Sequence, residues 1–182
     1  MKEKRTFGII FALLAVFLAI LPFVVTFNET LTHLVERFQL YMWVQERIVP
    51  LEVKMVGVLV SPLGIRYLAH QNGMTVNGIY AGMTWNCIGW QSLLLLIITL
   101  VVGLRGNYTL ISQIETILIG LLGTFFVNLG RLVFVVILLV YSRPLFAVVY
   151  HDYLAAIVTI IWLFGFWWFS YSFVLEEKEK MI

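Results

Sequence analysis

Residues 111–140 read ISQIETILIGLLGTFFVNLGRLVFVVILLV, and this apolar stretch decides the fold. A helix needs only ~20 residues, at about 1.5 Å of rise each, to cross the hydrocarbon core of a membrane. A helix over the whole stretch must therefore tilt, bend or break, and Gly120, Gly123 and Gly130 are positions for bending or for close packing. The stretch predicts a transmembrane helix and sets the class of the whole protein.

The composition points to the same class. Hydrophobic residues make up 62% of the 182 residues and charged residues only 12%, more apolar than a soluble domain of this length. A formal net charge of +2 without a long basic block argues against a nucleic-acid partner. The single cysteine excludes an intramolecular disulfide and the usual structural zinc spacings, and we expect neither a metal nor a cofactor.

Three further stretches are apolar enough to cross a membrane. They cover about 7–27, 88–104 and 153–174, which with 111–140 gives four predicted transmembrane helices in a single membrane domain, 1–182. The first follows a basic head and has two interpretations, a signal peptide or an uncleaved anchor. Because the apolar part is long and no small-x-small cleavage site follows it, the sequence favours the anchor.

The segment of about 28–87 lies between the first two predicted spans. Thr30 to Val49 has apolar residues at helical spacing, which predicts an amphipathic helix, and Val53 to Val60 predicts a packed or re-entrant helix. Ile65 to His70 and Met74 to Tyr80, separated by a Gln-Asn-Gly turn, predict a small hairpin. The expected fold is an all-α integral membrane protein: a polytopic bundle of about four transmembrane helices, one or two amphipathic or re-entrant helices, and a small extracytoplasmic hairpin.

Basic residues near the predicted spans set the orientation, because Lys and Arg in short flanks favour the cytoplasm. With four crossings, one side of the membrane holds Lys2, Lys4, Arg5, Arg105, Lys178 and Lys180. We therefore expect a multi-pass cell-membrane protein whose two termini are cytoplasmic. Cys87 and His151 then emerge on the extracytoplasmic face.

Cys87 is a candidate nucleophile. It stands where a polar, turn-rich stretch becomes the apolar run Leu93 to Val102. The partial positive charge of a helix start at this point would favour the reactive thiolate. The alternative is a cysteine that packs as a small hydrophobic side chain.

Arg131 and His151 support the reactive interpretation. An arginine within an apolar run costs at least ~2.5 kcal/mol on insertion scales unless it faces a paired or wet interior, and such residues are functional by default. Asn128 lies three residues earlier on nearly the same helical face and is placed to orient the guanidinium. The structural alternative ties Arg131 to a carbonyl or to Glu115. His151 lies at the edge of the last apolar run, and together Cys, Arg and His can perform acyl transfer.

Three motifs in order resemble the exosortase/archaeosortase family of polytopic membrane transpeptidases. They are Cys87-x-Gly89-x-x-Ser92 before a membrane helix, Asn128-x-x-Arg131 inside a later one, and a histidine that opens the last one. The resemblance covers roughly Val60 to Phe173. Ile88 departs from the family pattern, which usually has a small hydroxyl residue after the cysteine.

The resemblance implies a cysteine protease and transpeptidase that recognises the C-terminal sorting signal of exported proteins, made of a short motif, a hydrophobic helix and a basic tail. It implies that Cys87 attacks the peptide carbonyl to give a thioester, that Arg131 stabilises the oxyanion and that His151 transfers protons. A lipid amine, a cell-envelope amine or water then accepts the acyl group. Substrate-binding or supporting roles fall to Asn86, Gln91, Ser92 and Asn128, with polar pairing between helices as the alternative.

Two other functions remain open at this stage. A membrane protease that only hydrolyses would use the same three groups with water as the acceptor. A non-catalytic membrane scaffold or a small transporter would use none of them.

Overall fold

The computed structural model describes residues 33, 36, 37, 39, 41–142, 144–151 and 155–178. The chain divides into two compact units, residues 1–42 and 43–182. In the first unit, His33 Nδ1 lies 3.7 Å from Glu36 Oε2, one helical turn along the chain. The predicted transmembrane helix 7–27, and most of the predicted amphipathic helix before Tyr41, lie outside the described residues.

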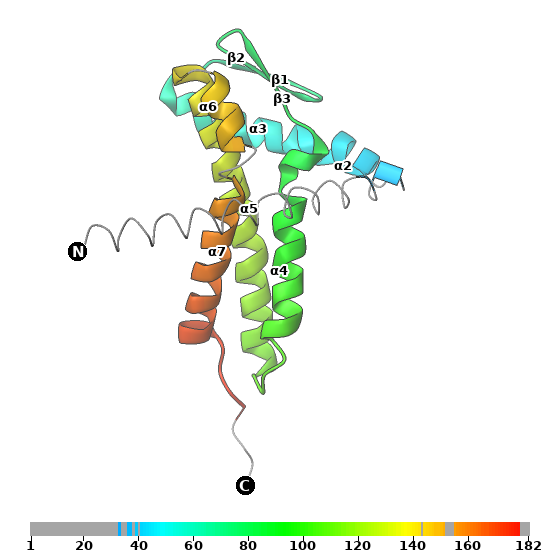
Figure 1. The fold of residues 1–182 in the computed structure, drawn as a ribbon, viewed down its shortest axis with the longest axis vertical. Helices are drawn as coiled ribbons and strands as arrows, with labels where there is room; N and C mark the ends of the chain where they lie inside the picture. The colour runs from blue at the N-terminus through cyan, green and yellow to red at the C-terminus, as the bar shows by residue number, and fades with distance from the viewer. Residues whose placement is uncertain are drawn as a thin grey trace, which may run out of the picture. The chain divides into compact units, whose positions relative to one another are not determined.

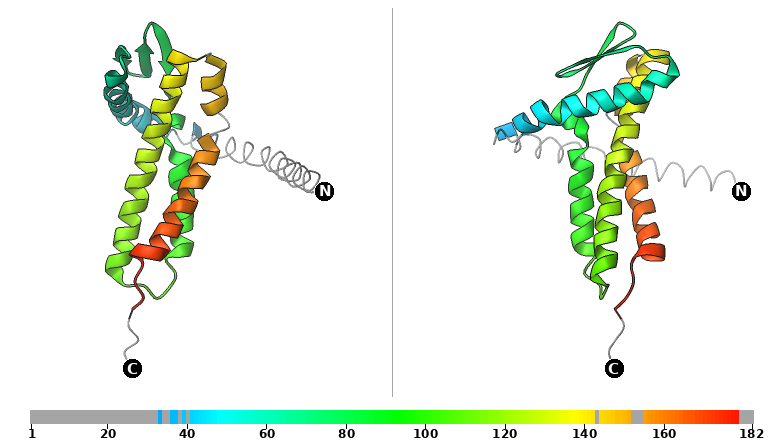
Figure 2. Two further views of the ribbon diagram at one scale, coloured as in Figure 1. Left: turned by 90° about the vertical axis from the view of Figure 1, so that its left-hand side faces the viewer. Right: turned by 180° about the vertical axis from the view of Figure 1, so that it is seen from behind.

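Three long helices run side by side in the second unit: α4 (Trp90–Gly103), α5 (Leu110–Tyr141) and α7 (Ala155–Phe169) (Figures 1 and 2). Counted with the helical turns that continue them, the apolar stretches cover Trp85–Gly103, Leu110–Tyr141 and Ile157–Val174, of 19, 32 and 18 residues. Each is long and apolar enough to cross a membrane. They confirm the prediction of apolar helices at 88–104, 111–140 and 153–174.

Small residues on α5 let the helices approach closely. The buried positions of α5 recur every fourth residue, at Ser112, Thr116, Gly120, Thr124 and Asn128. A methyl group added at Gly120 would lie 3.0 Å from Phe166 on α7 and 3.1 Å from Leu96 on α4. Gly120 therefore provides close packing between helices. Helix α5 is uninterrupted, so it does not break at this glycine.

Helix α3 (Val49–Val60) crosses near the end of the bundle and packs against α5 and the sheet (Figure 1). Its buried stripe has helical spacing, and Val49, Val53, Val56 and Val60 are at most 1% exposed. Pro50 lies in the first turn, where its missing N–H is tolerated. The prediction of a packed helix at Val53 to Val60 is thus confirmed, and a shorter helix α2 (Tyr41–Arg47) ends just before it.

A three-stranded antiparallel sheet corrects the all-α prediction. Its strands are β1 (Tyr67–His70), β2 (Gly73–Val76) and β3 (Ile79–Gly82), in the order β1-β2-β3. The expected strand Met74 to Tyr80 is wrong, because Asn77 and Gly78 have φ of 48° and 87° and form a second tight turn. The fold is mostly helical with a small sheet, and the Asn-Gly pair was the sequence signal for the extra hairpin.

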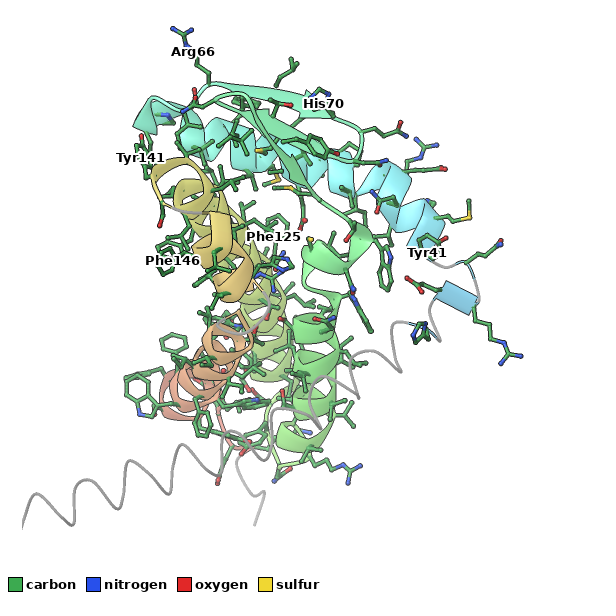
Figure 3. The ribbon with its side chains drawn as sticks, turned by 45° about the horizontal axis from the view of Figure 1, so that its top comes forward. Tyr41, Arg66, His70, Phe125, Tyr141 and Phe146 are labelled. Carbon is green, nitrogen blue, oxygen red and sulfur yellow. The ribbon has the colours of Figure 1, made fainter. Side chains whose placement is uncertain are left out.

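The sheet and the end of α5 enclose the core that supports the candidate site. Met74 and Val76 of β2 pack with the valines of α3 and with Leu132 and Val136 of α5. The Tyr141 hydroxyl donates to the Leu63 carbonyl at 2.9 Å, which joins the end of α5 to the segment after α3 (Figure 3). After α5, the short helix α6 (Pro144–Val149) packs back against it and leads to His151.

Candidate active site

Cys87 lies in a short 3₁₀ helix, η2 (Trp85–Ile88), directly before α4. Its backbone N–H donates to the Thr84 carbonyl at 2.8 Å, and its side chain is only 9% exposed. Gly89, with φ of 76°, ends this turn and caps α4, which begins at Trp90. Cys87 therefore precedes the helix as predicted, and it lies outside the first turn of α4, where the helix dipole acts most strongly.

His151 approaches the thiol from a distant part of the chain. Cys87 Sγ lies 3.5 Å from His151 Nε2 and 3.8 Å from Thr84 Oγ1. A contact of this length allows a hydrogen bond to sulfur, and the imidazole is placed to take the thiol proton. The structure thus brings together the first two residues of the predicted catalytic set.

Arg131 and Asn128 meet the same peptide group from α5. Arg131 Nη2 donates to the Cys87 carbonyl at 3.0 Å, and Asn128 Nδ2 donates to that oxygen at 3.2 Å. Residues three apart lie on one helical face, which lets the two side chains converge. Of the two partners considered for Arg131, a carbonyl is the one found, while Glu115 is exposed on a distant turn of α5.

Two polar atoms of this pair remain without a hydrogen bond in the described part of the chain. They are the buried Arg131 Nε and the buried Asn128 Oδ1. Leaving a buried donor unpaired costs about 1–3 kcal/mol, and more when the group is charged. The buried N–H at Nε is therefore a donor without a partner among the described residues, on the side chain that holds the Cys87 carbonyl.

Glu52 is a site neighbour that the sequence reasoning missed. This acidic residue is only 4% exposed on α3, and burial raises its pKa to about 7. The positive charge of Arg131 and the nearby Asn128 carboxamide oppose that rise. The available signal was its spacing: Glu52 is three residues after Val49 and four before Val56, on the apolar face of the helix.

Gly89 has a second role beyond ending the turn. A methyl group added there would lie 2.7 Å from Asn128 Cγ, well inside van der Waals contact. The backbone at Gly89 therefore presses against the Asn128 carboxamide, and the positive φ disfavours any other residue. This contact gives a physical reason for the glycine in the Cys87-x-Gly89 motif.

Gln45, on α2, fixes the segment that carries the thiol. Its Oε1 accepts from the Trp85 N–H at 2.7 Å, and its Nε2 donates to Asn72 Oδ1 at 3.1 Å. The first bond holds the start of η2, and the second holds the turn between β1 and β2. The sheet and the thiol-bearing turn are thus tied to one side chain.

The other predicted supporting residues make bonds around α4. Asn86 Oδ1 accepts from Trp90 Nε1 at 2.7 Å and from Gln91 Nε2 at 3.3 Å. Ser92 Oγ lies 2.9 Å from Thr159 Oγ1, a buried contact between α4 and α7. These bonds stabilise the start of α4 and its packing, whereas Asn128, the fourth of these residues, hydrogen-bonds to the Cys87 carbonyl.

These features define a class: a mostly helical protein with three helices long and apolar enough to cross a membrane, and a Cys-His-Arg cluster beside their ends. Among the described residues, no three His, Cys, Asp or Glu side chains are grouped as a metal site requires. Comparisons with protein-family models, with curated proteins and with solved structures gave no significant match to the chain.

Proposed function

We propose that this chain is a membrane-embedded cysteine transpeptidase, similar to the exosortase/archaeosortase family, that cleaves C-terminal sorting signals of exported proteins. The observation that carries the proposal is the contact of 3.5 Å between Cys87 Sγ and His151 Nε2. Arg131 supports it, because its half-buried guanidinium lies against the peptide group of the same cysteine, and its buried Nε has no hydrogen-bond partner among the described residues.

The proposed reaction has two acyl-transfer steps. His151 takes the proton of the Cys87 thiol, and the sulfur attacks the scissile carbonyl, whose developing oxyanion accepts a hydrogen bond from Arg131 Nε. The C–N bond then breaks, His151 returns the proton to the leaving amine, and a thioester remains on Cys87. An acceptor amine attacks the thioester and gives a proton to His151. The C–S bond then breaks, an amide forms, and the Cys87 thiolate takes the proton back from His151.

Membrane insertion and orientation are part of the proposal. Large apolar side chains such as Ile98, Phe126, Phe164 and Trp168 are exposed on the three long helices, as lipid contact requires. Arg105 follows the end of α4, in the loop between α4 and α5, whereas Cys87 precedes the start of α4. The loop lies at the end of the bundle opposite α3 (Figure 1). With that loop in the cytoplasm, the thiol faces the extracytoplasmic side.

The proposed substrate suits this arrangement. A sorting signal with a hydrophobic helix can lie in the bilayer against the exposed apolar helices, while its basic tail remains in the cytoplasm. Its recognition motif then reaches the extracytoplasmic surface, at the level of the thiol. The proposed acceptor is a lipid or envelope amine.

The test replaces Cys87 by Ala and follows co-resident proteins that have a C-terminal hydrophobic helix and a basic tail. We expect the unprocessed precursor to accumulate in the variant, and Ser172→Ala, which removes an exposed hydroxyl, is the matched control. Mass spectrometry of the mature C-terminus identifies the acceptor: a new amide supports transfer, and a free carboxylate means hydrolysis alone. If no precursor accumulates although the variant inserts stably, the scaffold or transporter alternative replaces the proposal.

A further inference from the structure

Glu52 is an ionisable residue on an otherwise apolar buried face. The side chains beside it on α3 belong to Val49, Val53 and Val56, each at most 1% exposed, and Glu52 itself is 4% exposed. A carboxyl group in such a place is tolerated only when neighbouring groups hydrogen-bond it or balance its charge. Its neighbours therefore indicate what it does.

The groups that stabilise Glu52 are the ones that hold the Cys87 peptide group. The Asn128 carboxamide and the positive charge of Arg131 both stabilise the carboxylate, and both come from α5, on which α3 packs. The same two side chains donate to the Cys87 carbonyl at 3.2 Å and 3.0 Å. Glu52, Asn128, Arg131 and the thiol-bearing turn thus form one buried polar cluster between α3, α5 and η2.

We propose that Glu52 is a positioning residue of the candidate site: its carboxyl group orients Asn128 and Arg131 against the Cys87 carbonyl and sets the charge around the thiol. The reaction that it serves rests on the proposed function, whereas its coupling to the thiol is measurable without any substrate.

The charge of Glu52 changes near neutral pH. Burial raises the pKa of this carboxyl to about 7, against the opposing effects of Arg131 and Asn128. The groups that face the cluster are Arg131 from α5, Cys87 from η2, and Tyr150 and His151 from the segment after α6. On the sheet side, β1 places the Tyr67 ring against α3 at Gly57, and Lys54 on α3 itself is exposed.

The sign of the coupling follows from these charges. Arg131 interacts electrostatically with both Cys87 and Glu52. An ionised Glu52 therefore offsets part of the attraction between the guanidinium and the thiolate, which disfavours the thiolate. A protonated Glu52 removes that charge. Glu52→Gln imitates the protonated form at every pH, so its effect on the thiol should appear only above the pKa of Glu52.

The experiment measures the rate at which iodoacetamide alkylates Cys87, the only cysteine, in the full-length protein in detergent between pH 5.5 and 9. We expect Glu52→Gln to match the native protein at pH 5.5 and to react several-fold faster at pH 8.5. Glu46→Gln, on an exposed residue of α2, is the matched control and should follow the native profile throughout. Because His151 contacts the thiol directly, the pair is repeated with His151→Gln in both proteins, where the same divergence is expected.

The inference would be overturned if the alkylation rates of the Glu52→Gln and native proteins had the same pH dependence, with His151 present and with His151→Gln, while the variant kept its melting curve. If Glu52→Gln does not fold, Glu52→Asp is used instead, because it withdraws the carboxyl group by one methylene. This variant should move the inflection of the alkylation rate to another pH, and an unchanged inflection would also contradict the inference. A divergence without precursor accumulation in Cys87→Ala keeps the positioning role and removes the sorting function. Cys87-dependent processing with parallel profiles removes only the role of Glu52.

Discussion

The first half of α5 and its second half, at the α3 end, bury polar groups in different ways. In the first half, buried hydroxyls are neutral and paired: Trp162 Nε1 donates to Thr124 Oγ1 at 2.9 Å, and Thr116 Oγ1 donates to the Ser112 carbonyl at 2.8 Å. At the α3 end, Arg131 and Glu52 are ionisable, and Asn128 Oδ1 and Arg131 Nε have no partner among the described residues. The same α5 face thus carries paired hydroxyls along one half and an incompletely paired, ionisable cluster along the other.

This difference distinguishes polar residues that hold the helices together from polar residues that we propose to serve the reaction. Paired neutral hydroxyls hold helices together at little electrostatic cost, as expected of packing inside a membrane. An unpaired buried donor and a buried acid reduce stability, and sites of this kind are common where they serve a function. Ser170, a buried hydroxyl without a partner in the described part of the chain, lies away from the cluster in the π-helical turn after α7.

The largest effect is expected at Arg131. Arg131→Gln removes the guanidinium that faces the Cys87 peptide group and should lower precursor processing by roughly 10²–10³-fold, the usual effect of losing one oxyanion donor. The measurement is the rate of processing in membranes, normalised to the amount of inserted protein.

The matched control for this comparison is Thr124→Val on the same helix. It leaves the Trp162 N–H unpaired and should destabilise the protein by about 1–3 kcal/mol while processing per folded molecule stays native. Equal losses of processing in the two variants would erase the proposed distinction between the two halves of α5.

A second, smaller effect is the pH dependence of stability caused by Glu52. In the folded protein the pKa of Glu52 is about 7, above its ordinary value of 4.5. Between these two pH values the carboxyl group is therefore more protonated in the folded protein than in the unfolded chain. Stability should therefore fall as the pH rises from about 4.5 to 7, by roughly 3 kcal/mol, and stay low above that range.

Glu52→Gln lacks this titration and isolates the effect. Melting followed by tryptophan fluorescence in detergent at pH 5 and pH 8 should show a drop in the native protein that is largely absent from the variant. Identical drops in the two proteins would mean that the carboxyl is ionised throughout and is not held in an apolar environment.

The sequence predicted the elements that depend on local composition. Three long apolar helices follow directly from hydrophobic runs, and Arg131 stood out because an arginine is costly in such a run. Cys87 and His151 were found because each lies at the edge of an apolar stretch, and the structure brings them to 3.5 Å.

Other features depend on tertiary contacts that local patterns do not encode. Glu52 reads locally as a polar residue at the edge of a short apolar segment, and only the packing of α3 on α5 reveals it beside Arg131. Ser92 shows the same limit, because motif spacing cannot tell which neighbouring helix a hydroxyl will meet, and its contact is with Thr159 on α7. The third strand was predictable in principle, since Asn77-Gly78 is a hairpin signal, but the apolar run around it was read as one strand.

The smallest effect is expected at the contact between Ser92 and Thr159. The two hydroxyl oxygens lie 2.9 Å apart, buried between α4 and α7, and the contact belongs to the paired, structural half of the comparison. Ser92→Ala should lower stability by only about 1 kcal/mol, because hydrogen bonds between membrane helices contribute little net free energy. Processing per folded molecule should remain native, as measured in the same membrane assay beside the melting curve. A loss of processing without a change in melting would place Ser92 in the active site, as its position in the Cys87-x-Gly89-x-x-Ser92 motif first suggested. The first turn of α4 would then contribute to the reaction as well as to helix packing.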